Sequence, residues 1–105
     1  MSRAADRLRV QVTIMQISFP FEPPTYRGFD PALSFPALVD GRRVRCAITA
    51  EALEDHFRAM SSREQDLVDA FSHHRAAIEQ AARCLLEEVG GRPIVLHSGY
   101  FRFCA

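Results

Sequence analysis

The 105-residue sequence predicts an α+β fold, in which a small antiparallel β-sheet of three to five strands packs against helices. Two local patterns lead to this fold class: an Asp40-Gly41 dipeptide between two β-rich runs, and a long amphipathic stretch that ends at two glycines. The composition agrees, because 48% apolar and 25% charged residues are ordinary for one globular domain. We expect residues 15–105 to form that single domain and residues 1–14 to be an N-terminal extension.

The central element is a β-hairpin formed by residues 32–39 and 42–49. A two-residue loop at Asp40-Gly41 sets a register that brings Phe35 opposite Cys46. One face of the hairpin then collects only apolar side chains, namely Leu33, Phe35, Ala37, Val44, Cys46 and Ile48. Because a slip by one residue would mix apolar with charged side chains, the pattern fixes the register.

Proline determines where further strands can pair. Pro36 falls at a non-hydrogen-bonded position of the hairpin and has no N–H to offer on its other side. We therefore expect residues 32–39 to be an edge strand and residues 42–49 to pair with another strand on their far side. The candidates are an N-terminal strand over residues 10–19, broken after Met15, and a C-terminal one.

Two helices are expected between the hairpin and the C-terminal strand. A short helix covers about residues 50–59 with Thr49 as its N-cap, and a long one covers about residues 62–89. Ser61 and Glu64 have the spacing of a capping box, and Gly90-Gly91 stops the long helix. After it, Ile94–His97 and Tyr100–Phe103 are β-rich and predict a bulged strand or two short strands.

Charge and cysteine content limit the classes of function. The formal net charge is zero, so binding to nucleic acid or to an anionic membrane would require a local basic patch. Cys46, Cys84 and Cys104 are far apart and odd in number, which does not support a disulfide framework. The first 20 residues lack the apolar run of a signal peptide, and no stretch approaches the roughly 20 apolar residues of a membrane span. We expect a cytoplasmic protein with no membrane partner.

The sequence resembles a known family. The stretch from Phe35 to Gly41, followed by Val44, Cys46 and Ile48 and then by Glu51-Ala52-Leu53 and His56-Phe57, is similar to a family of short bacterial proteins known as domain of unknown function 1488. The similarity covers about residues 15–103. It implies a small α+β fold and a bacterial source. It implies no activity and transfers no catalytic residue.

Arg42, Arg43 and Arg45 form the only local basic cluster, and on the hairpin Arg43 and Arg45 project from the face opposite the apolar one. They are a candidate anion site for phosphate, a nucleic-acid backbone or an acidic partner. The alternative, which we favour, is that these charges deter edge-to-edge association of strands. Three arginines without interleaved exposed aromatic side chains fall short of a typical nucleic-acid interface.

The residues that could support catalysis or metal binding have ordinary structural explanations. Cys46 and His56 are near in sequence, but Cys46 lies on the apolar face, where a thiol is inert. His73 and His74 point about 100° apart on a helix and cannot chelate one ion together. A zinc site formed by His97, Cys84 or Cys104 would depend on the fold. We predict no catalytic residue, no metal and no cofactor.

The sequence thus predicts a non-enzymatic binding or interaction module, with an unidentified protein partner or a second copy of the chain as its ligand. The alternative is a nucleic-acid- or anion-binding accessory protein that uses Arg42, Arg43 and Arg45.

Overall fold

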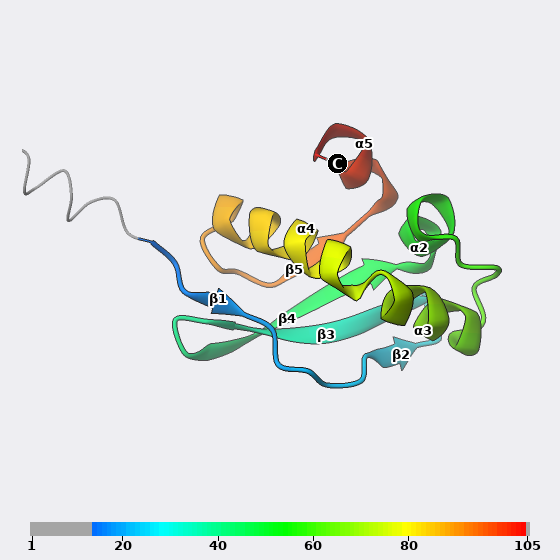
Figure 1. The fold of residues 1–105 in the computed structure, drawn as a ribbon, viewed down its shortest axis with the longest axis horizontal. Helices are drawn as coiled ribbons and strands as arrows, with labels where there is room; N and C mark the ends of the chain where they lie inside the picture. The colour runs from blue at the N-terminus through cyan, green and yellow to red at the C-terminus, as the bar shows by residue number, and fades with distance from the viewer. Residues whose placement is uncertain (1–13, 105) are drawn as a thin grey trace, which may run out of the picture.

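The computed structural model describes residues 14–104 and shows a five-stranded sheet with helices packed on one face (Figure 1). The strands are β1 (Ile17–Ser18), β2 (Thr25–Arg27), β3 (Ala32–Val39), β4 (Arg42–Thr49) and β5 (Ile94–Leu96). The helices are α2 (Ala50–Phe57), α3 (Glu64–His73), α4 (Arg75–Glu88) and α5 (Ser98–Cys104). The α+β class is confirmed. Of the strand expected over residues 10–19, positions 10–13 lie outside the described residues, and within 14–19 only Ile17–Ser18 is a strand.

The predicted hairpin is confirmed with its register. Strands β3 and β4 pair from Val39 opposite Arg42 to Ala32 opposite Thr49, so Phe35 faces Cys46. Asp40 and Gly41 both have positive φ, 51° and 83°, as a type I′ turn requires. The apolar face is buried: each of the six predicted side chains is at most 6% exposed.

Strand β3 is central in the sheet, so its prediction as an edge strand is wrong. Strand β1 pairs with one end of it, Ile17 opposite Val39, and β2 pairs with the other, Thr25 opposite Ser34. Between β1 and β2, the N-terminal segment leaves the sheet opposite Pro36. A continuous strand would lack a hydrogen bond at this point, because proline has no backbone N–H to donate. The proline therefore interrupts the neighbouring strand instead of excluding it.

The sheet is mixed, which corrects the expectation of a purely antiparallel one. Strand β4 does pair on its far side with a C-terminal strand, but β5 runs parallel to it, with Ala47 opposite Val95. The helices between β4 and β5 return the chain to the end of the sheet where β4 began, and this return makes the pair parallel.

The second half of the predicted C-terminal strand is helical. Residues from Ser98 form α5, which packs on α2 through an edge-to-face contact between Phe101 and Phe57, with centroids 5.2 Å apart. Phe101 is buried in this contact. The β-preference of Tyr100 and Phe101 is thus overridden by packing.

The predicted long helix is two helices, because His74 has non-helical dihedrals (φ −120°, ψ 23°) between α3 and α4. A straight helix over residues 64–88 would be about 37 Å long, whereas an eight-residue strand spans about 26 Å. The break lets both helices stay over the sheet. The buried stripe nevertheless continues across it, through Leu67, Ala70, Phe71, Ile78, Ala82 and Leu86.

The helix ends agree only in part with prediction. Thr49 caps α2 as expected, since its Oγ1 accepts the N–H of Ala52 at 3.1 Å. Helix α2 ends at Phe57 rather than near residue 59, because Arg58 is left-handed (φ 64°). The capping box is wrong: Ser61 Oγ accepts the N–H of Arg63 and donates to Asp66 at 2.6 Å. Within residues 14–104, no helix has the length and apolar character needed to cross a bilayer.

Candidate binding site on the open face of the sheet

The two faces of the sheet differ in what covers them. Helices α3 and α4 lie on the face formed by the apolar side chains of the hairpin (Figure 1). By the strand register, the opposite face carries Ser18, Thr25, Arg27, Ser34, Pro36, Leu38, Arg43, Arg45, Ala47 and Val95. Apart from Ala47, these side chains are exposed or half-buried. We call this the open face.

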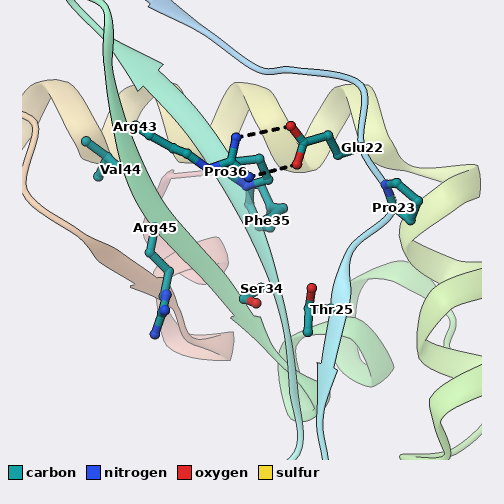
Figure 2. Close-up of a pocket in the computed structure, with 9 residues that line it drawn as sticks. All are labelled: Glu22, Pro23, Thr25, Ser34, Phe35, Pro36, Arg43, Val44 and Arg45. Carbon is teal, nitrogen blue, oxygen red and sulfur yellow. Dashed lines mark hydrogen bonds and ion pairs between the residues drawn. The ribbon is translucent and has the colours of Figure 1, made fainter.

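A hollow of about 380 Å³ lies on the open face, beside the interruption of the N-terminal strand (Figure 2). Its position follows from Pro36, because the segment that leaves the sheet there uncovers the middle of β3. The lining residues are Glu22, Pro23, Thr25, Ser34, Phe35, Pro36, Arg43, Val44 and Arg45. The hollow therefore combines two guanidinium groups, two hydroxyls and one carboxylate.

Arg43 and Glu22 form a bidentate ion pair across Pro36 (Figure 2). Arg43 Nη2 donates to Oε1 at 2.8 Å and Nη1 donates to Oε2 at 3.1 Å. The hydrogen bonds from Arg43 lower the pKa of the Glu22 carboxyl, and the same contacts raise the pKa of Arg43. Both side chains remain accessible, at 60% and 41% exposure, so solvent competes with the pair.

The backbone of Glu22 is held from the helical layer by Arg75 of α4. Arg75 Nη1 donates to the carbonyl of Glu22 at 2.9 Å, and Nη2 donates to that of Pro20 at 3.2 Å. Its Nε donates to Glu79 at 2.8 Å, and its guanidinium lies 4.9 Å from the ring centroid of Phe21. We call residues Pro20–Glu22 the strap. Arg75 fixes its path and thereby aims the Glu22 side chain at the hollow.

The three predicted arginines do not all lie on the same face of β4. Arg43 and Arg45 share the open face, as expected, whereas Arg42 has the strand parity of Val44 and Cys46 and lies at the hairpin tip. Among the described residues, Arg45 has no ion pair. Because β5 pairs only with residues 46–48, no described strand covers the outer edge of β4 at the arginines. Edge protection and ligand binding are both compatible with this placement.

Cys46 and His56 do not form a dyad. The Cys46 side chain is fully buried in the core, and this burial raises the pKa of its thiol to about 12. The ring of His56 contacts Ser98 and Phe101 instead. Cys84 is exposed on α4, and the side chain of Cys104 is outside the described part of the structure.

We expect iodoacetamide to modify Cys84 in the folded protein and to react with Cys46 more than about 100-fold more slowly. The reason is that only the thiolate reacts, and burial keeps the Cys46 thiol protonated. Peptide mapping by mass spectrometry before and after denaturation measures the modification of both cysteines.

The burial of Cys46 also makes stability depend on pH. Folding favours the protonated thiol, so the contribution of Cys46 to stability is complete below pH 9.0 and falls as pH rises toward about 12. Equal rates at Cys46 and Cys84 in the native protein would contradict this burial.

Asp55, His56 and Ser98 form a hydrogen-bonded group that joins α2 to α5. No sequence motif predicts this group. Ser98 Oγ donates to Asp55 at 2.6 Å, and Nε2 of His56 lies 3.0 Å from the Ser98 carbonyl and 3.2 Å from its Oγ. In a catalytic triad the histidine stands between the serine and the acid and takes the hydroxyl proton. Here the Ser98 hydroxyl donates its hydrogen bond to the carboxylate instead, and Ser98 is buried, so the group connects the two helices.

The adjacent histidines His73 and His74 have different partners. His73 is exposed and its Nδ1 lies 2.8 Å from the carbonyl of Asp69. His74 is half-buried, with its ring 5.4 Å from that of Phe57. Within the described residues, no three His, Cys, Asp or Glu side chains are grouped so that they could hold a metal ion.

Fold and site together define a small α+β protein with a mixed sheet whose helix-free face carries a polar hollow. The chain belongs to the family described as protein of unknown function (DUF1488), whose model matches residues 17–96. The match extends from β1 through β5 and thus contains every residue that lines the hollow. No curated protein matches the chain. No solved structure matches it either.

Proposed function

We propose that this protein is a non-enzymatic binding module whose hollow on the open face holds an acidic segment of a partner protein. The observation that carries the proposal is the bidentate grip of Arg43 on a carboxylate, with Arg45 two residues further along the same face. Arginine presents a planar fork that matches a carboxylate in this geometry. The Glu22 carboxylate therefore indicates how a ligand carboxylate would be held.

The spacing of the two arginines favours an extended ligand. Residues two apart on one strand face lie about 6.6 Å from each other, and so do alternate side chains of an extended peptide. A segment with acidic residues at alternate positions could thus place one carboxylate on Arg43 and the next on Arg45. Hydroxyls of Thr25 and Ser34 line the same hollow and can donate to polar groups of the ligand.

Nucleic-acid binding through Arg42, Arg43 and Arg45 is the less favoured alternative. Only two of these arginines share a face of the sheet, which is a small basic surface for a nucleic-acid backbone. The zero net charge of the chain supplies no general attraction. The buried thiol of Cys46 and the engaged hydroxyl of Ser98 support a non-enzymatic role. Among the described residues, Cys46 and Cys84 are free thiols, which suits the cytoplasm that we propose as the location of the protein.

Fluorescence anisotropy with two labelled peptides tests the proposal, one with Glu and the other with Gln at alternate positions. We expect only the acidic peptide to bind and Arg45→Ala to weaken binding roughly fivefold or more. Arg42→Ala is the matched control, because it removes the same charge from the other face of β4. Binding should weaken as salt is raised.

Several outcomes would contradict the proposal. Equal losses in Arg42→Ala and Arg45→Ala would indicate unspecific attraction, and equal binding of the Gln peptide would exclude carboxylate recognition. Tighter binding of a labelled DNA duplex at the same salt concentration would favour the nucleic-acid alternative. Self-association is tested by measuring the molecular mass of the protein in solution. A dimer that dissociates in the Arg45→Ala variant would show that the ligand of the hollow is a second copy of the chain.

A further inference from the structure

We propose that Glu22 is a built-in competitor for the hollow, a carboxylate of the chain itself that occupies the Arg43 guanidinium until a ligand carboxylate displaces it. This inference rests on the proposed function and adds a regulation of the same site. It assigns to Glu22 the control of affinity rather than a role in holding the ligand.

The ion pair has the two properties that a competitor needs. It occupies the guanidinium of Arg43, because both terminal nitrogens already donate to Glu22, at 2.8 and 3.1 Å. It is also accessible, with the Arg43 side chain 60% and the Glu22 side chain 41% exposed. Exposed ion pairs exchange readily with water and other ions, so an incoming carboxylate can replace Glu22 without disturbing the core.

Arg75 makes the competition persistent. It fixes the carbonyls of Pro20 and Glu22 from the helical layer, so the Glu22 carboxylate cannot move far from Arg43 after displacement. A tethered group acts at a high effective concentration against a free ligand. A displaced Glu22 would in addition lie near the negative charge of the ligand and repel it. Both effects lower the affinity of the native protein.

The experiment compares the acidic peptide's affinity for the wild type, Glu22→Gln and Glu87→Gln. We expect Glu22→Gln to bind roughly three- to tenfold more tightly than the wild type. Glu87 is an exposed carboxylate on α4 outside the hollow, so Glu87→Gln makes the same change in net charge and should leave the affinity within about twofold. The gain should vanish in an Arg43→Ala background, because the competition requires that guanidinium.

A second measurement reports directly on displacement. In the free protein, Arg43 holds the pKa of the Glu22 carboxyl below its ordinary value. Carbon-13 NMR titration of that carboxyl should show its pKa rising when saturating acidic peptide occupies Arg43.

The outcomes separate this inference from the proposed function. Peptide binding that depends on Arg45 but is the same in Glu22→Gln and Glu87→Gln would reject the competitor and leave the binding module intact. Weaker binding of Glu22→Gln would also reject it, since Glu22 would then orient Arg43 for the ligand. Absence of peptide binding in every variant would reject the proposed function itself.

Discussion

Replacing Phe71 with alanine is expected to lower the free energy of unfolding by about 3–5 kcal/mol. Phe71 is fully buried on α3 and joins the helical layer to the sheet, with its ring centroid 5.2 Å from that of Phe35 on β3. The guanidinium of Arg75 lies 5.1 Å from the same ring. Truncation would leave a cavity at the centre of the core and remove both contacts. The total free energy of unfolding of a domain of this size is only about 5–15 kcal/mol, so the expected loss is a large part of it.

Urea denaturation followed by circular dichroism measures this loss. Phe29→Ala is the matched control, because that phenylalanine is 95% exposed and its removal should change the stability by less than about 0.5 kcal/mol. Similar midpoints for the two variants would show that Phe71 is not the centre of the core. Should Phe71→Ala fail to fold, Phe71→Leu, which keeps most of the volume, is expected to fold with a smaller loss.

Arg75→Lys is expected to destabilise the protein by about 2–3 kcal/mol although it conserves the charge. The Arg75 side chain is only 14% exposed, and its three nitrogens donate to Glu79, Glu22 and Pro20. A lysine ammonium cannot reach these acceptors together, so carbonyls of the strap would lose their donors.

The control for Arg75→Lys is Arg63→Lys. The Arg63 side chain is 83% exposed and lies 3.4 Å from Asp66, so its replacement by lysine should be nearly neutral. Hydrogen exchange read by mass spectrometry should show faster exchange of the strap in Arg75→Lys. Wild-type stability and unchanged exchange would mean that Arg75 does not hold this segment.

The hairpin was predictable because its information is local. Asp40-Gly41 specifies the turn, and the alternation around Phe35 and Cys46 specifies which face is buried. The same reasoning placed Arg43 and Arg45 on the open face and Thr49 at the start of a helix. Each of these features depends on residues within a few positions of one another.

The features that sequence reasoning missed depend on contacts between distant segments. Pro36 excludes one hydrogen bond, but the sequence does not show that the neighbouring segment bypasses that point and pairs with β3 on both sides of it, as β1 and β2 do. Tyr100 and Phe101 have side chains typical of strands and become helical because α2 offers Phe57 as a packing partner. The helix break at His74 could not be predicted, because no glycine or proline lies near it in the sequence.

Glu22 and Arg75 were missed in the site for the same reason. Glu22 lies 21 residues from Arg43, and the Arg75 contact to its carbonyl spans 53 residues. No motif connects such positions, since the fold alone brings them together. The Pro-rich segment around Pro20 and Pro23 indicated a loop, but nothing in it indicated that the loop would return a carboxylate to the hairpin.

The parallel pairing of β5 with β4 has a consequence for how the chain acquires its structure. The hairpin closes a two-residue loop and can form within microseconds, whereas β5 must wait until all residues from 50 to 93 have been arranged. On the ribosome, the hairpin therefore emerges before the strand that completes the sheet has been synthesised. During that interval the whole outer side of β4 is unoccupied, and the positive charges of Arg42, Arg43 and Arg45 would discourage two nascent chains from pairing there.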